Sequence, residues 1–211
     1  SEDIDAFLNQ IRIEISPEVY SDVEQGQLVR PLGVELEITN ACNLRCIHCF
    51  QKYHPGDEMS LKKIISIIET INNNGVFEIA IIGGEPMCHG NIMEILAACE
   101  ERDLAYSMVT NGTLINHESI KAFREFSRLS VMVSLDGVGL VHESIRGKGT
   151  FKKVDRILRG LVDAGVEVET LCTLNAENMS RFREVAEYCR KIGIVCNFNL
   201  FKPFCVLHCY F

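Results

Sequence analysis

The feature of this chain that most limits its fold is an alternation of short apolar segments with amphipathic ones. Six segments of strand length recur, at residues 34–39, 77–82, 105–110, 129–135, 166–173 and 194–200. The stretches between them carry apolar residues at helical spacing, as in Ile64, Ile67, Ile68 and Ile71. Each connection is long enough for a crossover helix, so the strands are expected to pair in parallel. The alternation therefore predicts an α/β fold.

The polar residues within the strands bear on the kind of α/β fold. Six strands fall short of the eight that close a TIM barrel, which leaves a doubly wound sheet or an incomplete barrel. A parallel strand covered on both faces is almost continuously apolar. Several of these strands instead have a polar face, formed by Glu35 and Glu37, Ser107 and Asn111, Ser130 and Ser134, Glu167 and Glu169, and Asn197 and Asn199. These strands either line a wet or ligand-filled cavity or lie at an edge facing water. The cavity favours a partial (β/α)6 TIM-type barrel.

Length and composition set the remaining limits. The 211 residues suffice for one domain with additions, which we divide into an N-terminal extension (1–30), a core barrel (31–203) and an apolar, cysteine-containing tail (204–211). The chain is 47% hydrophobic and 24% charged, which excludes a disordered or fibrous protein. The net charge of −8 argues against a nucleic-acid partner. No membrane-spanning run or signal peptide is visible, so we expect a cytoplasmic protein without a membrane partner.

Three of the ten cysteines form the strongest motif. Cys42, Cys46 and Cys49 directly follow the first strand, at the strand end where parallel barrels bind ligands. Three close thiolates suit a soft metal. A structural zinc would need a fourth ligand, such as His48, His54 or a distant cysteine. A [4Fe–4S] cluster held by three cysteines would leave one iron open to an outside ligand. The third alternative is three buried thiols without a metal.

Polar and glycine-rich segments follow the next strands. Gly83-Gly84-Glu85-Pro86 would let the backbone approach a ligand closely and supply a carboxylate for an ammonium group, although this signal alone is weak. Asn111-Gly112 and Ser134-Leu-Asp136-Gly137 place short polar side chains at the same end of the sheet, but both are also ordinary turn sequences.

A further glycine-rich segment runs from His142 to Thr150, and we expect it to be a loop. Its Arg146 either binds a carboxylate through its guanidinium or is a solvated loop charge.

Together these residues resemble the radical SAM superfamily over about residues 31–203. The spacing CxxxCxxC after the first strand is its cluster signature, and Gly-Gly-Glu-Pro after the second is its motif for the methionine moiety of S-adenosylmethionine (SAM). Ser-Leu-Asp-Gly, His-Glu-Ser-Ile-Arg and Gly-Thr-Phe are similar to the subgroup that modifies peptides and proteins. Longer members of that subgroup carry a SPASM or twitch domain behind the barrel.

The resemblance implies roles for the first two motifs. Cys42, Cys46 and Cys49 would hold three irons of a [4Fe–4S] cluster, and the fourth iron would take the amino and carboxylate groups of SAM. The loop of Gly83, Gly84 and Glu85 would bind the methionine amino group.

The resemblance also implies roles for residues that follow the later strands. Ser134 and Arg146 would hold the methionine carboxylate or the ribose, with Asn111 nearby. Thr173, at the end of the fifth strand, would border the adenine. No catalytic residue beyond these ligands is identified.

The implied reaction is a reductive cleavage of SAM that needs a low-potential electron donor. The resulting radical would abstract a hydrogen atom from a peptide or protein substrate. Two alternatives stay open: a radical SAM enzyme acting on a small metabolite or cofactor precursor, and a non-catalytic iron–sulfur or metal-binding module.

The end of the sequence raises a separate expectation. Cys205 and Cys209 are interpreted as the start of a lost domain or an altered ending. The apolar tail and the last strand, without a helix to cover it, predict self-association through residues 194–211.

Overall fold

The computed structural model describes residues 31–49, 58–102 and 104–201. The N-terminal extension 1–30, His54, Cys205, Cys209 and the tail 204–211 lie outside the described residues. The described elements are, in order, β1 (Gly33–Glu37), α3 (Leu61–Asn73), β2 (Glu78–Ile82), η1 (Pro86–Cys88), α4 (Ile92–Glu100), β3 (Ala105–Thr110), α5 (His117–Phe123), β4 (Leu129–Ser134), α6 (Leu140–Arg146), α7 (Thr150–Asp163), β5 (Glu167–Leu174), η2 (Met179–Arg181), α8 (Phe182–Ile192) and β6 (Val195–Leu200).

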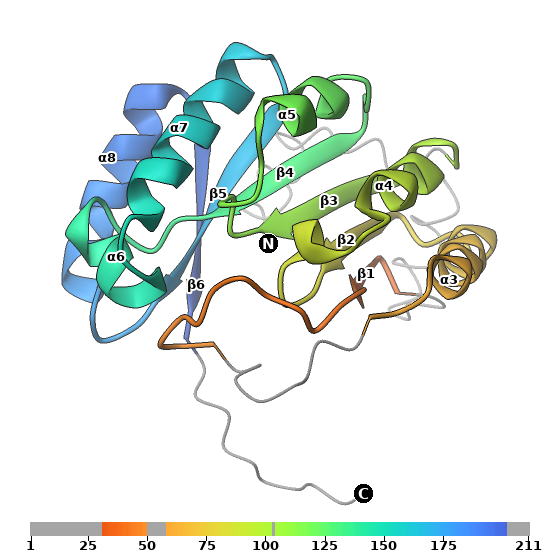
Figure 1. Cartoon of the computed structure of the whole chain (residues 1–211), viewed down its shortest axis with the longest axis horizontal. Coiled ribbons are helices and arrows are strands. Elements are labelled where there is room, and N and C mark those ends of the chain that lie inside the picture. The colour runs from red at the N-terminus through yellow and green to blue at the C-terminus, as the bar shows by residue number, and fades with distance from the viewer. Residues whose placement is uncertain (1–30, 50–57, 103, 202–211) are drawn as a thin grey trace, which may run out of the picture. The chain divides into compact units, whose positions relative to one another are not determined.

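The six strands form one sheet in the order β1-β2-β3-β4-β5-β6, and every neighbouring pair is parallel. A doubly wound sheet would reverse its strand order at a switch point. Here the order follows the sequence, and the helices lie along the outside of a curved sheet (Figure 1). The predicted fold, a partial (β/α)6 barrel, is confirmed.

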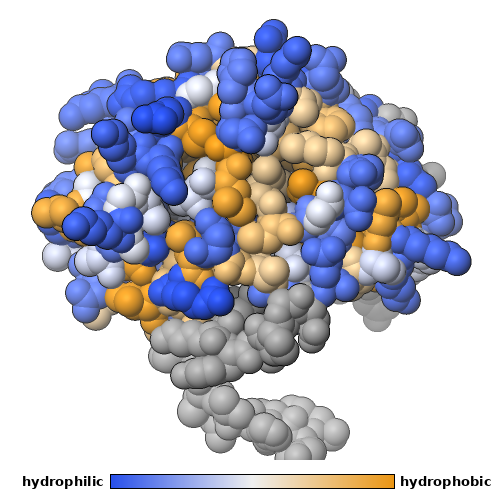
Figure 2. Space-filling model, viewed as in Figure 1, coloured by the Kyte–Doolittle hydropathy of each residue, from blue (hydrophilic) through white to orange (hydrophobic). Residues whose placement is uncertain are grey.

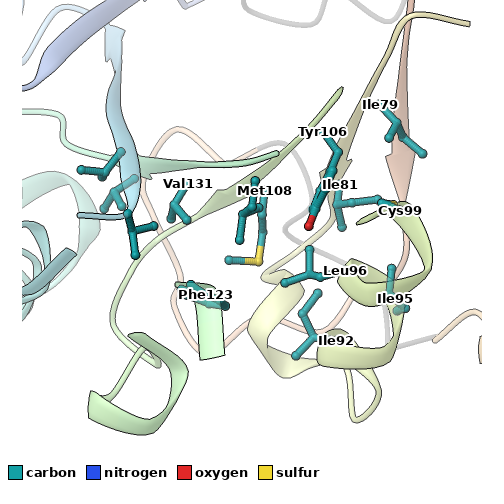
Figure 3. Packing of buried hydrophobic residues seen from close by; sticks show 14 of the residues in the cluster. Ile79, Ile81, Ile92, Ile95, Leu96, Cys99, Tyr106, Met108, Phe123 and Val131 are labelled. Atoms are coloured by element: carbon teal, nitrogen blue, oxygen red, sulfur yellow. The ribbon is translucent and has the colours of Figure 1, made fainter. Parts of the chain in front are cut away.

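A layer of apolar side chains joins the sheet to the helices. Leu36, Ile81, Met108 and Val131 are register partners on successive strands, and all are buried. Paired positions point to the same face of a sheet, so this row faces outward. Side chains of α4, including Leu96, pack close to it (Figure 3). Fully burying each such side chain contributes about 1.5–3 kcal/mol.

The polypeptide between β4 and β5 differs from the expected loop. Residues 140–146 form helix α6, which places Arg146 at a helix end. Gly149 is the cap of α7, with φ 79°, and the hydroxyl of Thr150, the first residue of α7, donates to the Gly147 carbonyl at 2.6 Å. The positive φ of Gly147 (113°) and Gly149 turns the chain tightly between two helices, which the sequence analysis took for one irregular segment.

The molecular surface separates polar and apolar residues. Hydrophilic residues cover the outer helices on both sides of the view in Figure 2, and a band of apolar residues lies between them. Within the described residues, no helix combines the length and apolar character that crossing a bilayer requires. The last strand, β6, pairs with β5 and leaves Val195 and Leu200 58% and 66% exposed.

Candidate functional site

A cavity of about 940 Å³ lies at the carboxyl ends of the strands. All ten site residues predicted from the sequence line it. Their assigned roles stay predictions, but the structure brings together side chains from six separate segments. The lining residues are Glu35, Cys42, Leu44, Cys46, His48, Cys49, Ile82, Gly83, Gly84, Glu85, Val109, Thr110, Asn111, Ser134, Arg146, Thr173, Phe198, Asn199, Leu200 and Phe201.

The glycine loop after β2 lies directly against the segment that leads into the cysteine motif. The amide of Gly84 donates to the Thr39 carbonyl at 2.7 Å, and the amide of Glu85 donates to the Ala41 carbonyl at 2.8 Å. A Cβ atom on Gly83 would lie 2.5 Å from the Thr39 oxygen, and one on Gly84 would lie 2.4 Å from the Ala41 oxygen. The glycines therefore permit close packing of two backbones, in addition to the close approach to a ligand expected from the sequence.

The cysteine loop presents three thiols to the cavity. Cys46 is buried, while Cys42 and Cys49 are partly exposed, and the Leu44 amide donates to the Cys42 sulfur at 3.4 Å. Burial raises the pKa of the Cys42 and Cys46 thiols, so deprotonation is disfavoured unless a positive partner binds. No three Cys, His, Asp or Glu side chains in the described part of the chain converge on a position for a single metal ion.

The donor set fits an iron–sulfur cluster on chemical grounds. Three soft sulfur ligands face one cavity, and an N–H···S hydrogen bond of the kind that tunes cluster potentials already points at Cys42. The remaining cavity walls supply a guanidinium, hydroxyls and backbone amides for a polar ligand beside the thiols. Cys42, Cys46 and Cys49 would hold the cluster.

Glu85 is 1% exposed, and its hydrogen bonds connect the glycine loop to the end of β3. Its carboxylate accepts hydrogen bonds from the Thr110 hydroxyl at 2.6 Å and from the amides of Asn111 at 2.7 Å and Met87 at 3.2 Å. Burial raises the pKa of Glu85, and these hydrogen bonds oppose that rise. Glu85 is therefore part of the folded framework as well as a candidate ligand residue, because its carboxylate joins the segments that follow two strands.

The Arg146 side chain is partly covered by its neighbours and is only 10% exposed. Its Nε–H donates to the carboxylate of Asp136. Burial alone would lower the pKa of Arg146, but the negative charge of Asp136 and the nearby sulfur of Cys46 hold it above its usual value. The alternative of a solvated loop charge is therefore wrong for Arg146.

Asp136 is the principal site residue that the sequence analysis missed. It is fully buried, and its second carboxylate oxygen accepts the Thr173 amide at 2.8 Å. Its own amide donates to Nδ1 of His142 at 3.2 Å, and its carbonyl accepts from the Asn178 side chain at 2.8 Å. The signal was present as Ser-Leu-Asp-Gly after β4, but Asp-Gly also reads as an ordinary turn.

Asn111 has both a turn role and a place in the cavity wall. Its side-chain oxygen accepts the Thr113 amide at 2.9 Å, as in an Asx turn, and its side-chain nitrogen donates to Asn43 of the cysteine loop at 2.9 Å. Ser134, at the end of β4, is buried and lines the cavity.

These features define a partial parallel barrel whose ligand cavity combines a three-thiol loop with a glycine-rich loop. The family model of the radical SAM superfamily matches residues 36–189. The chain belongs to the radical SAM superfamily.

Similar proteins extend this finding. The chain is 32% identical to the antilisterial bacteriocin subtilosin biosynthesis protein AlbA of Bacillus subtilis, over 77% of this chain and 38% of AlbA. It is also 32% identical to the AdoMet-dependent heme synthase of Nitratidesulfovibrio vulgaris, over 75% of this chain and 45% of that enzyme. The crystal structure of Streptococcus suis SuiB bound to S-adenosylmethionine matches with a TM-score of 0.78 at 18% identity, over 89% of this chain and 44% of SuiB. The chain thus spans less than half the length of each.

Proposed function

We propose that residues 31–203 form the SAM-binding core of an enzyme that abstracts a hydrogen atom from a peptide or protein. The observation that carries this proposal is the single cavity that Cys42, Cys46 and Cys49 share with the Gly83–Glu85 loop, whose Gly84 and Glu85 amides are hydrogen bonded to the segment that leads into the cysteine motif. When bound, the cluster and SAM supply a reductive cleavage of the sulfonium and hence a radical. The peptide class is supported by the likeness to AlbA.

The residues of the cavity have separate proposed tasks. The three cysteines hold the cluster, and the backbone of Gly83 and Gly84 faces the methionine amino group. Arg146 binds the methionine carboxylate, because its guanidinium is fixed on one side by Asp136 and lines the cavity.

The other residues that line the cavity are proposed to lie near the nucleoside part of SAM. Ser134 and Asn111 lie beside the proposed carboxylate and ribose positions, and Thr173 borders the adenine. The apolar side chains of Leu44, Ile82 and Val109 on the walls limit the access of water to a reactive intermediate.

A second candidate is a radical SAM enzyme acting on a small metabolite. The observation that favours it is the likeness to the heme synthase, which is as identical to this chain as AlbA is. Incubation with candidate precursor peptides and small precursors, with mass spectrometry of each, separates the two substrate classes.

The first experiment is anaerobic reconstitution with iron and sulfide. The proposal expects about four irons per chain and a change in the electron paramagnetic resonance signal of the reduced cluster when SAM is added. Cys42→Ala should abolish the cluster. The matched control is Cys99→Ala, because Cys99 is fully buried on α4 and does not line the cavity.

Two results would contradict the proposal. Stoichiometric zinc without iron uptake would favour a structural metal site. A loaded chain that forms no 5′-deoxyadenosine with a low-potential reductant and SAM would favour a non-catalytic iron–sulfur module.

We also propose that the protein works in the reducing cytoplasm with a low-potential electron donor. The support is chemical: all eight cysteines within the described residues are free thiols. Self-association through the β6 edge remains part of the proposal, supported by the exposure of Val195 and Leu200.

A further inference from the structure

One buried carboxylate connects two walls of the cavity. Asp136 follows β4; one of its oxygens accepts from Arg146 Nε at the end of α6, and the other accepts from the backbone amide of Thr173 near the end of β5. Its main chain is held as well, by His142 and Asn178. Asp136 itself does not line the cavity, whereas Arg146 and Thr173 do.

This connection determines which part of the guanidinium is free to meet a ligand. A guanidinium has five N–H donors in one plane, and here the Nε–H is directed at Asp136. The plane is thereby fixed, and within the described residues no other N–H of Arg146 makes a hydrogen bond. The two terminal nitrogens of the guanidinium are then suited to form bidentate hydrogen bonds with a carboxylate in the cavity.

The amide of Thr173 is fixed by the same carboxylate. Thr173 and Asn199 are register partners on β5 and β6, and both line the cavity. A shift of Asp136 would therefore displace the guanidinium of Arg146 and the end of β5 together.

We propose that Asp136 is a positioning residue for SAM binding: without contacting SAM, it orients Arg146 toward the methionine carboxylate and holds the end of β5 at the nucleoside. This inference rests on the proposed function. A purely structural role for the Asp136–Arg146 ion pair makes a different prediction. Loss of a structural pair would lower stability but would leave SAM affinity unchanged.

A double-mutant cycle on SAM affinity tests the inference. The cluster-loaded chain is titrated with SAM anaerobically by calorimetry, in the wild type, Asp136→Asn, Arg146→Gln and the double variant. Asp136→Asn keeps the side-chain volume and an acceptor for Thr173 but removes the charge. It should weaken SAM binding about tenfold, the loss expected when a charge-assisted bond is misaligned. In the Arg146→Gln background, Asp136→Asn should add no further loss.

The matched control is Asp155→Asn. Asp155 on α7 accepts hydrogen bonds from Arg159 at 3.0 Å and Tyr188 at 2.7 Å, and it does not line the cavity. Its replacement also removes an Asp–Arg pair and should lower the thermal midpoint, while SAM affinity stays at the wild-type value.

A second variant keeps the test decisive if Asp136→Asn does not fold. Asp136→Glu retains the negative charge beside Arg146 but moves it by one methylene, and it should still weaken SAM binding. Wild-type SAM affinity in either Asp136 variant, or additive losses in the cycle, would overturn the inference. Absence of SAM binding by the loaded wild type would instead contradict the proposed function, so the two failures are distinguishable.

Discussion

The environment of His142 predicts a specific loss of stability in mild acid. The ring is fully buried on α6, and Nδ1 accepts the Asp136 amide at 3.2 Å. The ring packs edge-on to Phe151, with centroids 6.2 Å apart, and Nε2 has no hydrogen-bond partner in the described part of the chain. Burial, and secondarily the positive charge of Arg146, lower the pKa of His142 from 6.5 to about 4, against the opposing charge of Asp136.

The sign and size of the effect follow from linkage between protonation and folding. Above pH 6.5 His142 is neutral in both the folded and unfolded states, so its contribution to stability is fully present. As the pH falls from 6.5 toward 4, His142 becomes protonated in the unfolded state but stays neutral in the folded state. The free energy of unfolding therefore decreases. A pKa lowered from 6.5 to about 4 corresponds to a loss of about 3 kcal/mol, at roughly 1.4 kcal/mol for each pH unit.

Urea unfolding at several pH values between 7.5 and about 4 measures this loss, with His142→Asn as the comparison. Asparagine places an oxygen where Nδ1 accepts the Asp136 amide, but it does not titrate in this range. Other groups titrate in both proteins, so the difference between the two curves isolates His142. The wild type should lose about 3 kcal/mol more than the variant across this range. Parallel curves would refute the reasoning.

Three further predictions concern the loops and the sheet edge. Gly84→Ala should destabilise the fold by about 3 kcal/mol, because the new Cβ would overlap the Ala41 carbonyl oxygen, whereas Gly90→Ala, with nothing within 4 Å of its Cβ, should leave urea unfolding almost unchanged. Glu85→Ala should cost about 1–3 kcal/mol in the same assay, because it leaves buried donors without an acceptor, and it should also weaken SAM binding. Leu200→Lys on the edge strand should shift light-scattering mass toward the monomer; unchanged mass would contradict association through β6.

The barrel was predictable because apolar periodicity records which side chains are buried. Ile64, Ile68 and Ile71 of the predicted stripe are buried on α3, and apolar residues at the same helical spacing are buried on α7, namely Val154, Ile157, Leu158 and Leu161. Strand ends were less well defined, since local sequence does not encode where a ladder hydrogen bond is last made. The first predicted strand extended two residues past β1, whose last residue is Glu37.

Burial of the polar site residues was not predictable in the same way. Arg146 lies in a segment with several glycines, which favours a loop in any local reading. Its Nε–H bonds to Asp136, ten residues away, and Cys46 in a different loop lies close enough to help raise the pKa of Arg146. Such contacts depend on the closure of the whole sheet, so periodicity could identify Arg146 as a candidate but not as a partner of Asp136.

Hydrogen bonds between the strand ends explain why motifs that are far apart in the sequence form one site. Gly84 links the loop after β2 to the segment after β1, and Glu85 links it to the residue that follows β3. Asp136 links β4 to β5, and the Ile47 amide bonds to the Ile145 carbonyl, which joins the cysteine loop to α6. The cavity walls are thus connected by hydrogen bonds that do not belong to the ladders between the strands.

This arrangement has a consequence for the sheet. A six-stranded barrel has two open edges, and a site held only by strand ladders would widen and narrow as those edges moved. The bond between the cysteine loop and α6 joins the segment after β1 to the helix after β4, two elements that follow strands which are not neighbours in the sheet. Ligand-binding geometry is precise only when its supporting groups are themselves fixed. The buried, paired state of Glu85 and Asp136 is therefore a requirement of an open barrel that must hold its site in one geometry.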